Sequence, residues 1–310
     1  MIREDTPIEE YEIKGKTIYV KREDLTTTFP GPNNSKIRGV LSYLQKLKEQ
    51  DITKVGVLDT KISRAGWIVS YVASNLGLTV YDFYPKYKDD KNLRFTQIMA
   101  KSFGANLVEQ RAGRQSIRYT QAKKFMQSVG GVMLPDMLKL KEAVIENAKV
   151  VESMDKELLK GSIIVPTGSA TILSGVLAGL CNLGLTNTNV YGILAANVTP
   201  KSRIANITSL LGELNFRPKP RVKIINAGFE YLTSCNISTP FPSDIYYDKK
   251  AWLWLIKNLE KLREPILFWN VGGEWDVESP YGGLEKGFRG DGFTSLSDVK
   301  SFLSKVMRNE

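Results

Sequence analysis

The chain has 310 residues, of which 42% are hydrophobic and 25% charged, and its 43 Lys and Arg against 33 Asp and Glu give a formal net charge of +10. It contains no histidine, which excludes a Ser-His-Asp or Cys-His triad, a histidine-ligated zinc site and any histidine general base. Its two cysteines, Cys181 and Cys235, are too few for a four-cysteine metal site or a disulfide framework, so we expect no metal centre.

Short apolar runs alternate with longer helical patterns along the chain. Strands are predicted at 55–58, 79–83, 106–108, 163–165, 190–194, 222–225 and 266–269. Helices are predicted at 66–76, 93–103, 116–127, 141–158, 172–183, 201–211, 249–262 and 296–307. Gly77 and Gly104, each between a helix and a strand, fit C-terminal helix caps. The alternation predicts an α/β fold with mainly parallel sheets flanked by helices.

The excess of basic over acidic residues has two interpretations. A pI near 9.3 fits an anionic partner such as nucleic acid, and it fits equally a lysine-rich surface that is merely solvated. Tyr87, Trp275 and Tyr281 are aromatic residues of the kind that stack on bases, although each is also an ordinary packing residue. No run of 18 apolar residues occurs, and the polar, acidic first residues do not resemble a signal peptide, so we expect a soluble, cytoplasmic protein.

Four segments place polar or reactive residues where strands and helices meet. A charged strand end at 20–25 precedes a polar loop at 33–39 that contains Lys36, although a lone lysine there is usually solvated. A polar loop at 61–64 precedes a predicted helix. The segment 165–175 is a strand, a small-residue turn and a helix start, where backbone N–H groups and the helix dipole favour phosphate. Residues 244–251 precede another helix, and 265–273 end in two glycines.

Together, in this order over roughly residues 18–275, the segments resemble the fold-type-II (tryptophan synthase β-like) pyridoxal-phosphate enzymes. The likeness is greatest to the branch of D-cysteine desulfhydrase and aminocyclopropane-carboxylate deaminase. The segments are similar to that family's KREDL strand with its lysine-bearing helix start, its SGN loop, its GSGGT phosphate loop and the branch motifs DPVY(T/E)GKA and ILFxHTGG. Two features depart from the pattern, because Arg64 stands at the family's asparagine and Asn270-Val271 replaces its His-Thr pair.

The resemblance implies pyridoxal 5'-phosphate as cofactor, with Lys36 forming the Schiff base and then acting as the base at the substrate. Ser63 and Tyr247 are implied as further catalytic residues that move protons, and Asp248 as the partner of the pyridine nitrogen. The other cofactor-binding residues implied are Arg64 and the phosphate-loop residues Thr167, Gly168, Ser169, Ala170 and Thr171.

The family architecture implies two interleaved α/β domains with the cofactor in the cleft between them. The small domain is expected at 50–155, inserted into a large cofactor-binding domain of 1–49 and 156–310. The family is often dimeric, so a homodimer is an expectation by analogy.

Three functions remain open on the sequence alone. The first is a pyridoxal-phosphate-dependent lyase that acts at the α-carbon of a free amino acid, by deamination, elimination or decarboxylation through a quinonoid carbanion. The second is a lyase or decarboxylase for an amino acid attached to a pyrimidine base of hypermodified, phage-type DNA, which the altered loop at 61–64 and the +10 charge favour. The third is an inactive binding protein of the same fold; Arg64 and Val271 favour it, whereas Lys36, Tyr247 and Asp248 argue against it.

Overall fold

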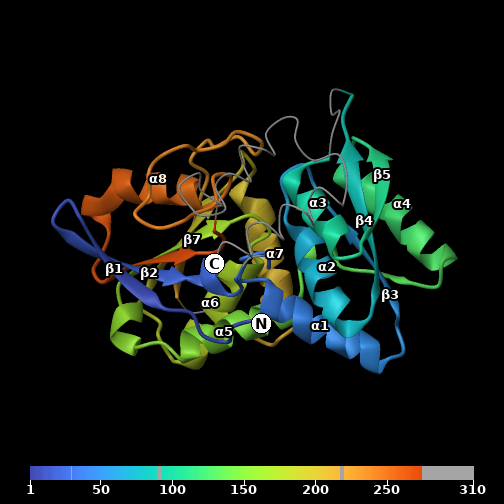
Figure 1. Cartoon of the computed structure of the whole chain (residues 1–310). Helices are drawn as coiled ribbons and strands as arrows, with labels where there is room; N and C mark the ends of the chain where they lie inside the picture. The colour runs from blue at the N-terminus through green and yellow to red at the C-terminus, as the bar shows by residue number, and fades with distance from the viewer. Residues whose placement is uncertain (29, 89–92, 217–219, 274–310) are drawn as a thin grey trace, which may run out of the picture. The chain divides into compact units, whose positions relative to one another are not determined.

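The computed structural model describes residues 1–28, 30–88, 93–216 and 220–273, and Figure 1 traces the chain. The described residues form two compact units. The first unit contains residues 1–42 and 138–273, and the second contains residues 43–137. The helix predicted at 296–307, and the aromatic residues Trp275 and Tyr281, lie outside the described residues.

A six-stranded sheet organises the first unit. Its strands, in spatial order, are β1 (Ile8–Ile13), β2 (Lys16–Arg22), β10 (Ile266–Asn270), β7 (Ser162–Thr167), β8 (Asn189–Leu194) and β9 (Arg221–Ile225). Only the edge pair of β1 and β2 is antiparallel among these strands, and the other neighbours run parallel. The carboxyl ends of β2, β10, β7 and β8 therefore meet at one edge of the sheet, where ligands bind in open α/β folds.

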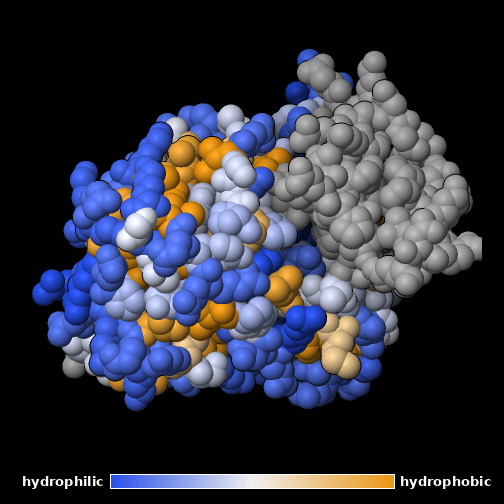
Figure 2. Space-filling view, turned by 60° about the vertical axis from the view of Figure 1, so that its left-hand side comes forward, coloured by the Kyte–Doolittle hydropathy of each residue, from blue (hydrophilic) through white to orange (hydrophobic). Residues whose placement is uncertain are grey.

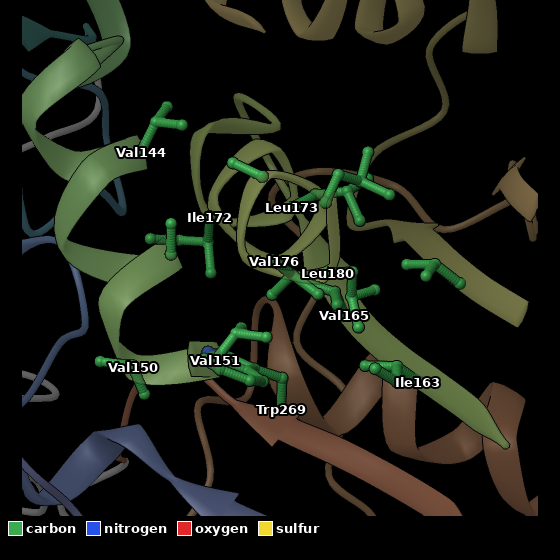
Figure 3. Close-up of a cluster of buried hydrophobic side chains, with 14 of the residues drawn as sticks. Val144, Val150, Val151, Ile163, Val165, Ile172, Leu173, Val176, Leu180 and Trp269 are labelled. Atoms are coloured by element: carbon green, nitrogen blue, oxygen red, sulfur yellow. The ribbon is translucent and has the colours of Figure 1, made fainter. Parts of the chain in front are cut away.

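Helices cover both faces of this sheet. Since successive strand residues point to opposite sides, one strand contributes side chains to the cores on both faces. Leu267 and Trp269 of β10 pack into one core with α5 (Lys141–Glu152), α6 (Thr171–Asn182) and α7 (Pro200–Gly212), part of which Figure 3 shows. Ile266 and Phe268 pack into the core on the other face, with α8 (Asp248–Asn258). The strand is buried on both sides, which explains its continuous apolar sequence.

Two glycines let α6 pack closely against α5. A Cβ atom at Gly175 would lie 2.5 Å from the Cβ of Asn147, and one at Gly179 would lie 2.6 Å from the Cβ of Val151. Larger side chains at these positions would push the helices apart. The close contact fixes the axis of α6, which begins at Thr171, the last of the predicted phosphate-binding residues.

The second unit is a smaller parallel sheet with helices. Its strands, in spatial order, are β5 (Asn106–Arg111), β4 (Thr79–Lys86), β3 (Lys54–Leu58) and β6 (Val132–Met133). Its helices are α2 (Ala65–Leu76), α3 (Phe95–Ser102) and α4 (Gln115–Ser128). The long helix α1 (Ile37–Glu49) begins in the first unit and continues into the second. Leu58 and Phe83 pack with Met126 of α4 to form one of its apolar clusters.

The predicted α/β class with parallel sheets flanked by helices is confirmed. Gly77 and Gly104 adopt the left-handed conformation expected of C-terminal caps, with φ values of 72° and 86°. The antiparallel β1–β2 hairpin was not predicted; it turns at Lys14 and Gly15, which both have positive φ. In the described ranges, no helix is both long enough and apolar enough to cross a lipid bilayer.

Part of the basic surface is neutralised within the chain. Figure 2 shows hydrophilic residues over much of the face that it displays, with hydrophobic residues between them. In the second unit the exposed Lys86 forms an ion pair with Glu109 at 2.9 Å, and the amine of Lys61 lies 4.5 Å from the ring centroid of Tyr87. The aromatic face of Tyr87 is therefore engaged by a cation of the same chain.

Candidate active site

The charged segment that follows β2 holds the start of α1 in place. Arg38, in the first turn of α1, donates from Nη1 to Oε2 of Glu23 at 2.6 Å and from Nη2 to Oε1 at 3.2 Å. The same Glu23 carboxylate accepts the hydroxyl of Thr6 at 2.6 Å, and Arg22 makes a two-bond pair with Asp24. Glu23 and Asp24 are buried, so these are internal pairs that fix geometry.

The polar loop before α1 is joined to the end of β10. Asn34 forms an isolated antiparallel bridge with Gly272. The N–H of Ser35 donates to the carbonyl of Val271 at 3.1 Å, and the N–H of Gly273 donates to the carbonyl of Asn33 at 3.4 Å. Lys36 therefore enters α1 directly beside the carboxyl end of a central strand.

The amine of Lys36 reaches the turn between β7 and α6. Its Nζ donates to Oγ of Ser169 at 3.1 Å, and Oγ of Ser169 lies 2.9 Å from Oγ1 of Thr171. Ser169 and Thr171 are buried, and Ala170 between them has a left-handed φ of 71°. Two predicted site segments, 133 residues apart in the chain, thus meet in one unit.

Tyr247 lies against the same turn. A Cβ atom at Gly168 would lie 3.2 Å from Cε1 of the Tyr247 ring, so a side chain there would press on the tyrosine. The hydroxyl of Thr167 donates to the carbonyl of Val165 at 2.9 Å, which engages it with its own strand. The turn therefore offers a small surface at Gly168 and hydroxyl groups at the start of α6.

Asp248 is a buried carboxylate at the start of α8. It is 1% exposed, and its Oδ1 accepts the N–H of Val271 at 2.6 Å. The preceding turn is fixed by Asp244, whose Oδ1 accepts the N–H groups of Tyr246 and Tyr247 at 2.8 and 2.9 Å. Val271, which replaces the family's threonine, thus contacts Asp248 through its backbone N–H, and any side chain at this position allows that contact.

Tyr231 belongs to this site although no sequence motif selects it. Its hydroxyl lies 2.8 Å from the hydroxyl of Tyr247, and the two ring centroids are 6.1 Å apart. The buried Lys250 helps to hold this loop, because its Nζ donates to the carbonyl groups of Ala195, Glu230 and Tyr231. Burial lowers the pKa of Lys250. Tyr231 lies in an irregular loop, where no periodicity marks a residue that faces inward.

The residues of the first unit fit a phosphorylated cofactor that binds to a lysine. The turn at 167–171 contains no acidic residue, and it ends in the first turn of a 12-residue helix, which favours an anion. The amine of Lys36 lies at that turn, and the buried carboxylate of Asp248 supplies a negative charge. A lysine amine, a turn that bears hydroxyl groups and a buried acid are groups that suit a pyridoxal-phosphate site.

Ser63 and Arg64 precede α2 in the second unit. Oγ of Ser63 accepts the N–H of Ala65 at 3.0 Å, and the Ser63 hydroxyl donates to the buried carboxylate of Asp59. Asp59 also accepts the N–H of Gly66 at 3.3 Å. Ser63 is thus tied to an acid at the carboxyl end of β3, a feature that the motif comparison did not reveal.

A second buried acid lies beside Asp59. An ideal Cβ atom at Gly66 would lie 2.2 Å from Oδ2 of Asp82 and 2.8 Å from Oδ2 of Asp59, so both carboxyl groups border the same small space. Burial raises the pKa of Asp59 to about 7, and burial together with the charge of Asp59 raises the pKa of Asp82 well above its usual range. Arg118 opposes both shifts through its charge, while its Nη2 donates to the carbonyl groups of Asp59 and Phe83.

The family follows from matches over most of the chain. A family model described as "Pyridoxal-phosphate dependent enzyme" matches residues 2–213. A "Glycyl-dTMP PLP-dependent decarboxylase" of Pseudomonas phage M6 is 37% identical over 282 residues, which cover 88% of this chain and all of that protein. The chain belongs to the fold-type-II family of pyridoxal-phosphate-dependent enzymes, and pyridoxal phosphate is its cofactor.

Solved structures share the fold. An ACC deaminase homologue matches with a TM-score of 0.73 and 20% identity over 91% of this chain and 92% of its own. A threonine deaminase from T.th. matches with a TM-score of 0.63 and 18% identity over 87% and 93% of the two chains. Maize serine racemase matches with a TM-score of 0.65 and 14% identity over 91% and 93%. The predicted family, cofactor and class of enzyme, a pyridoxal-phosphate-dependent lyase, are confirmed.

Proposed function

We propose that this lyase removes the carboxylate of an amino acid carried on a pyrimidine nucleotide, as in phage-type hypermodified DNA. The observation that carries the proposal is the 37% identity to a phage protein named for decarboxylation of glycyl-dTMP. The match covers the whole length of that phage protein. The site supports it, because the Lys36 amine lies at the turn that would hold the cofactor's phosphate, and decarboxylation needs a group that delivers a proton to the α-carbon.

The residues of the first unit have distinct proposed roles. When bound, pyridoxal phosphate supplies a ring that accepts the electron pair released at the substrate α-carbon. Ser169 and Thr171, with the backbone at 167–170, would hold its phosphate, and Lys36 would hold its carbonyl carbon through Nζ. Asp248 would keep a negative charge at the ring nitrogen, positioned by the N–H of Val271.

Lys36 is also the proposed proton carrier at the reacting carbon. In the decarboxylation the bond from the α-carbon to the carboxylate breaks, CO2 leaves, and the α-carbon takes up one proton, which Nζ of Lys36 would deliver. The Tyr247 hydroxyl, oriented by the hydroxyl of Tyr231, would assist the proton movement. The net product is an aminoalkyl group that remains on the nucleotide.

Several further proposals rest on the sequence, either on the family resemblance or on composition and charge. Ser63 would move protons, and Arg64 would contact the cofactor in place of the family's asparagine. The basic surface would contact DNA, the enzyme would form a homodimer, and it would act in the cytoplasm. Deamination of a free amino acid is the alternative activity, favoured by the motifs shared with the desulfhydrase and deaminase branch.

The test offers both substrate classes to the purified enzyme with added cofactor. We expect mass spectrometry to show loss of CO2 from a glycyl-thymine nucleotide, and no comparable release of CO2 or ammonia from glycine, D-cysteine or aminocyclopropane carboxylate. Lys36→Ala should abolish the reaction, whereas Lys123→Ala, which removes an exposed amine of α4, should not. Turnover of free amino acids alone would contradict the nucleotide proposal.

A further inference from the structure

Arg203 is a half-buried cation that the proposed reaction leaves without a role. It lies in the first turn of α7, and its Nε is buried without a hydrogen-bond partner among the described residues. Its Nη1 donates to the hydroxyl of the adjacent Ser202 at 3.3 Å, and no carboxylate of the described chain forms an ion pair with it. Removing a guanidinium from water without an acid partner is unfavourable, so the arrangement favours an anion that comes from outside the chain.

The surroundings of Arg203 place it beside the active site. The groups that act on its charge are the hydroxyls of Tyr231 and Tyr247, while burial lowers its pKa. One turn farther along α7, Nδ2 of Asn206 donates to the carbonyl of Ser169 at 3.1 Å. This side of α7 therefore faces the turn that receives the amine of Lys36.

We propose that the guanidinium of Arg203 binds a phosphate group of the nucleotide substrate. The inference rests on the proposed function and names the part of the substrate that this side of the site recognises. A guanidinium offers several N–H donors in one plane, which match the several acceptor oxygens of a phosphate. The cofactor's phosphate is a separate group, for which Ser169 and Thr171 are the proposed donors.

A binding measurement tests the inference without requiring turnover. The enzyme loaded with pyridoxal phosphate is titrated by calorimetry with thymidine 5′-monophosphate and with thymidine. We expect the monophosphate to bind about tenfold to hundredfold more tightly, as for charge-assisted hydrogen bonds, and Arg203→Gln to remove this difference. Arg203→Lys should retain part of it, because the charge stays while the fork of donors is lost.

Lys201→Gln is the matched control, since it removes an exposed charge two residues earlier on the same helix and should keep the wild-type difference. The affinity of each variant for pyridoxal phosphate is measured by absorbance, and we expect it to be unchanged in Arg203→Gln. Equal affinity for the two compounds in the wild type, no binding of either, or a normal difference in Arg203→Gln would overturn the inference. Weaker cofactor binding in Arg203→Gln would overturn it too, because the arginine would then serve the cofactor.

The outcome is separable from that of the proposed function. Phosphate-dependent binding without any decarboxylation would leave the inference in place and refute the proposed reaction. Decarboxylation that is unaffected by Arg203→Gln, with no phosphate-dependent binding, would refute the inference and leave the proposed reaction in place.

Discussion

Two strand-to-helix turns of this molecule have opposite electrostatics. In the first unit β7 leads into α6 through residues 167–171, where hydroxyl groups and the Lys36 amine gather. In the second unit β3 leads into α2 through residues 59–64, where the carboxyl group of Asp59 is buried beside that of Asp82. The first arrangement attracts an anion, whereas the second favours the retention of a proton. The same connection, from a parallel strand to a helix, can therefore carry different chemistry, which depends on the side chains that gather there.

The buried acids show the same difference. Asp248 of the first unit accepts a backbone N–H at 2.6 Å, so its charge is supported. Both carboxyl oxygens of Asp82 are buried without a hydrogen-bond partner in the described part of the chain. An unsupported buried carboxyl group favours its neutral form. We therefore expect the pair of Asp59 and Asp82 to keep at least one proton near neutral pH.

The largest expected effect is on turnover. Asp248→Asn keeps the shape of the side chain and removes its charge, so we expect turnover to fall on the order of 100-fold, or about 2.7 kcal/mol in the barrier. Steady-state kinetics with saturating cofactor measures the loss. Asp51→Asn is the control, because Asp51 is exposed and already has a left-handed φ of 59°, which asparagine tolerates. Normal turnover in Asp248→Asn would remove this residue from the site.

Gly168 in the first turn and Gly66 in α2, just after the second turn, can be compared by the same substitution. In Gly66→Ala the new methyl group would lie 2.2 Å from Oδ2 of the buried Asp82, so we expect a loss of about 2 kcal/mol in the free energy of unfolding. In Gly168→Ala the nearest atom is Cε1 of Tyr247 at 3.2 Å, so the ring can yield by a few tenths of an ångström. We expect Gly168→Ala to impair activity more than stability. Urea unfolding and steady-state kinetics of both variants test these expectations. A smaller loss of stability in Gly66→Ala than in Gly168→Ala would contradict them.

The acid pair predicts a dependence of stability on pH. The pKa of Asp59 is about 7 in the folded protein against 3.8 as its ordinary value, so the folded state binds more protons between these values. The free energy of unfolding should therefore fall as the pH rises from about 4 to above 7. Asp59→Asn should reduce this fall. The free energy of unfolding of the variant minus that of the wild type should be roughly 1–3 kcal/mol more favourable at pH 8 than at pH 5. Unfolding curves of wild type and variant that shift in parallel with pH would contradict the prediction.

The smallest expected effect concerns Ala170 in the phosphate turn. Its φ of 71° is a conformation that glycine adopts more easily than alanine. Ala170→Gly should therefore stabilise the first unit by about 0.5–1 kcal/mol, since relief of strain exceeds the added freedom of the unfolded chain. Thermal unfolding measures the change, and Ala112→Gly, outside any helix or strand, serves as the control. A destabilised Ala170→Gly would show that the turn is not strained.

Local patterns in the sequence predicted most of the fold, because apolar runs marked the buried strands. Lys36 and the other site residues were predicted only through the resemblance of segments such as 20–25 and 33–39 to the fold-type-II family. The β1–β2 hairpin escaped prediction because Glu9, Glu10 and Glu12 give β1 a charged sequence. The predicted domain limits at 50 and 155 stay a prediction.

Contacts between distant segments could not be predicted. Tyr231 meets Tyr247, and Asp59 meets Asp82, only through the three-dimensional fold, so no local pattern marks these pairs. Arg203 likewise occupies an ordinary position on a helical pattern, and its burial among tyrosines becomes visible only in the folded unit. Side-chain chemistry that depends on such meetings requires the structure.

The central claim is that Lys36 is the residue that binds the cofactor. The most direct measurement is reduction of the enzyme and pyridoxal phosphate with borohydride, followed by peptide mapping by mass spectrometry. The account predicts an absorption band at roughly 410–430 nm before reduction, and afterwards a phosphopyridoxyl group on Lys36. Absence of the band, or a label on another lysine such as the buried Lys250 with Lys36 unmodified, would contradict it.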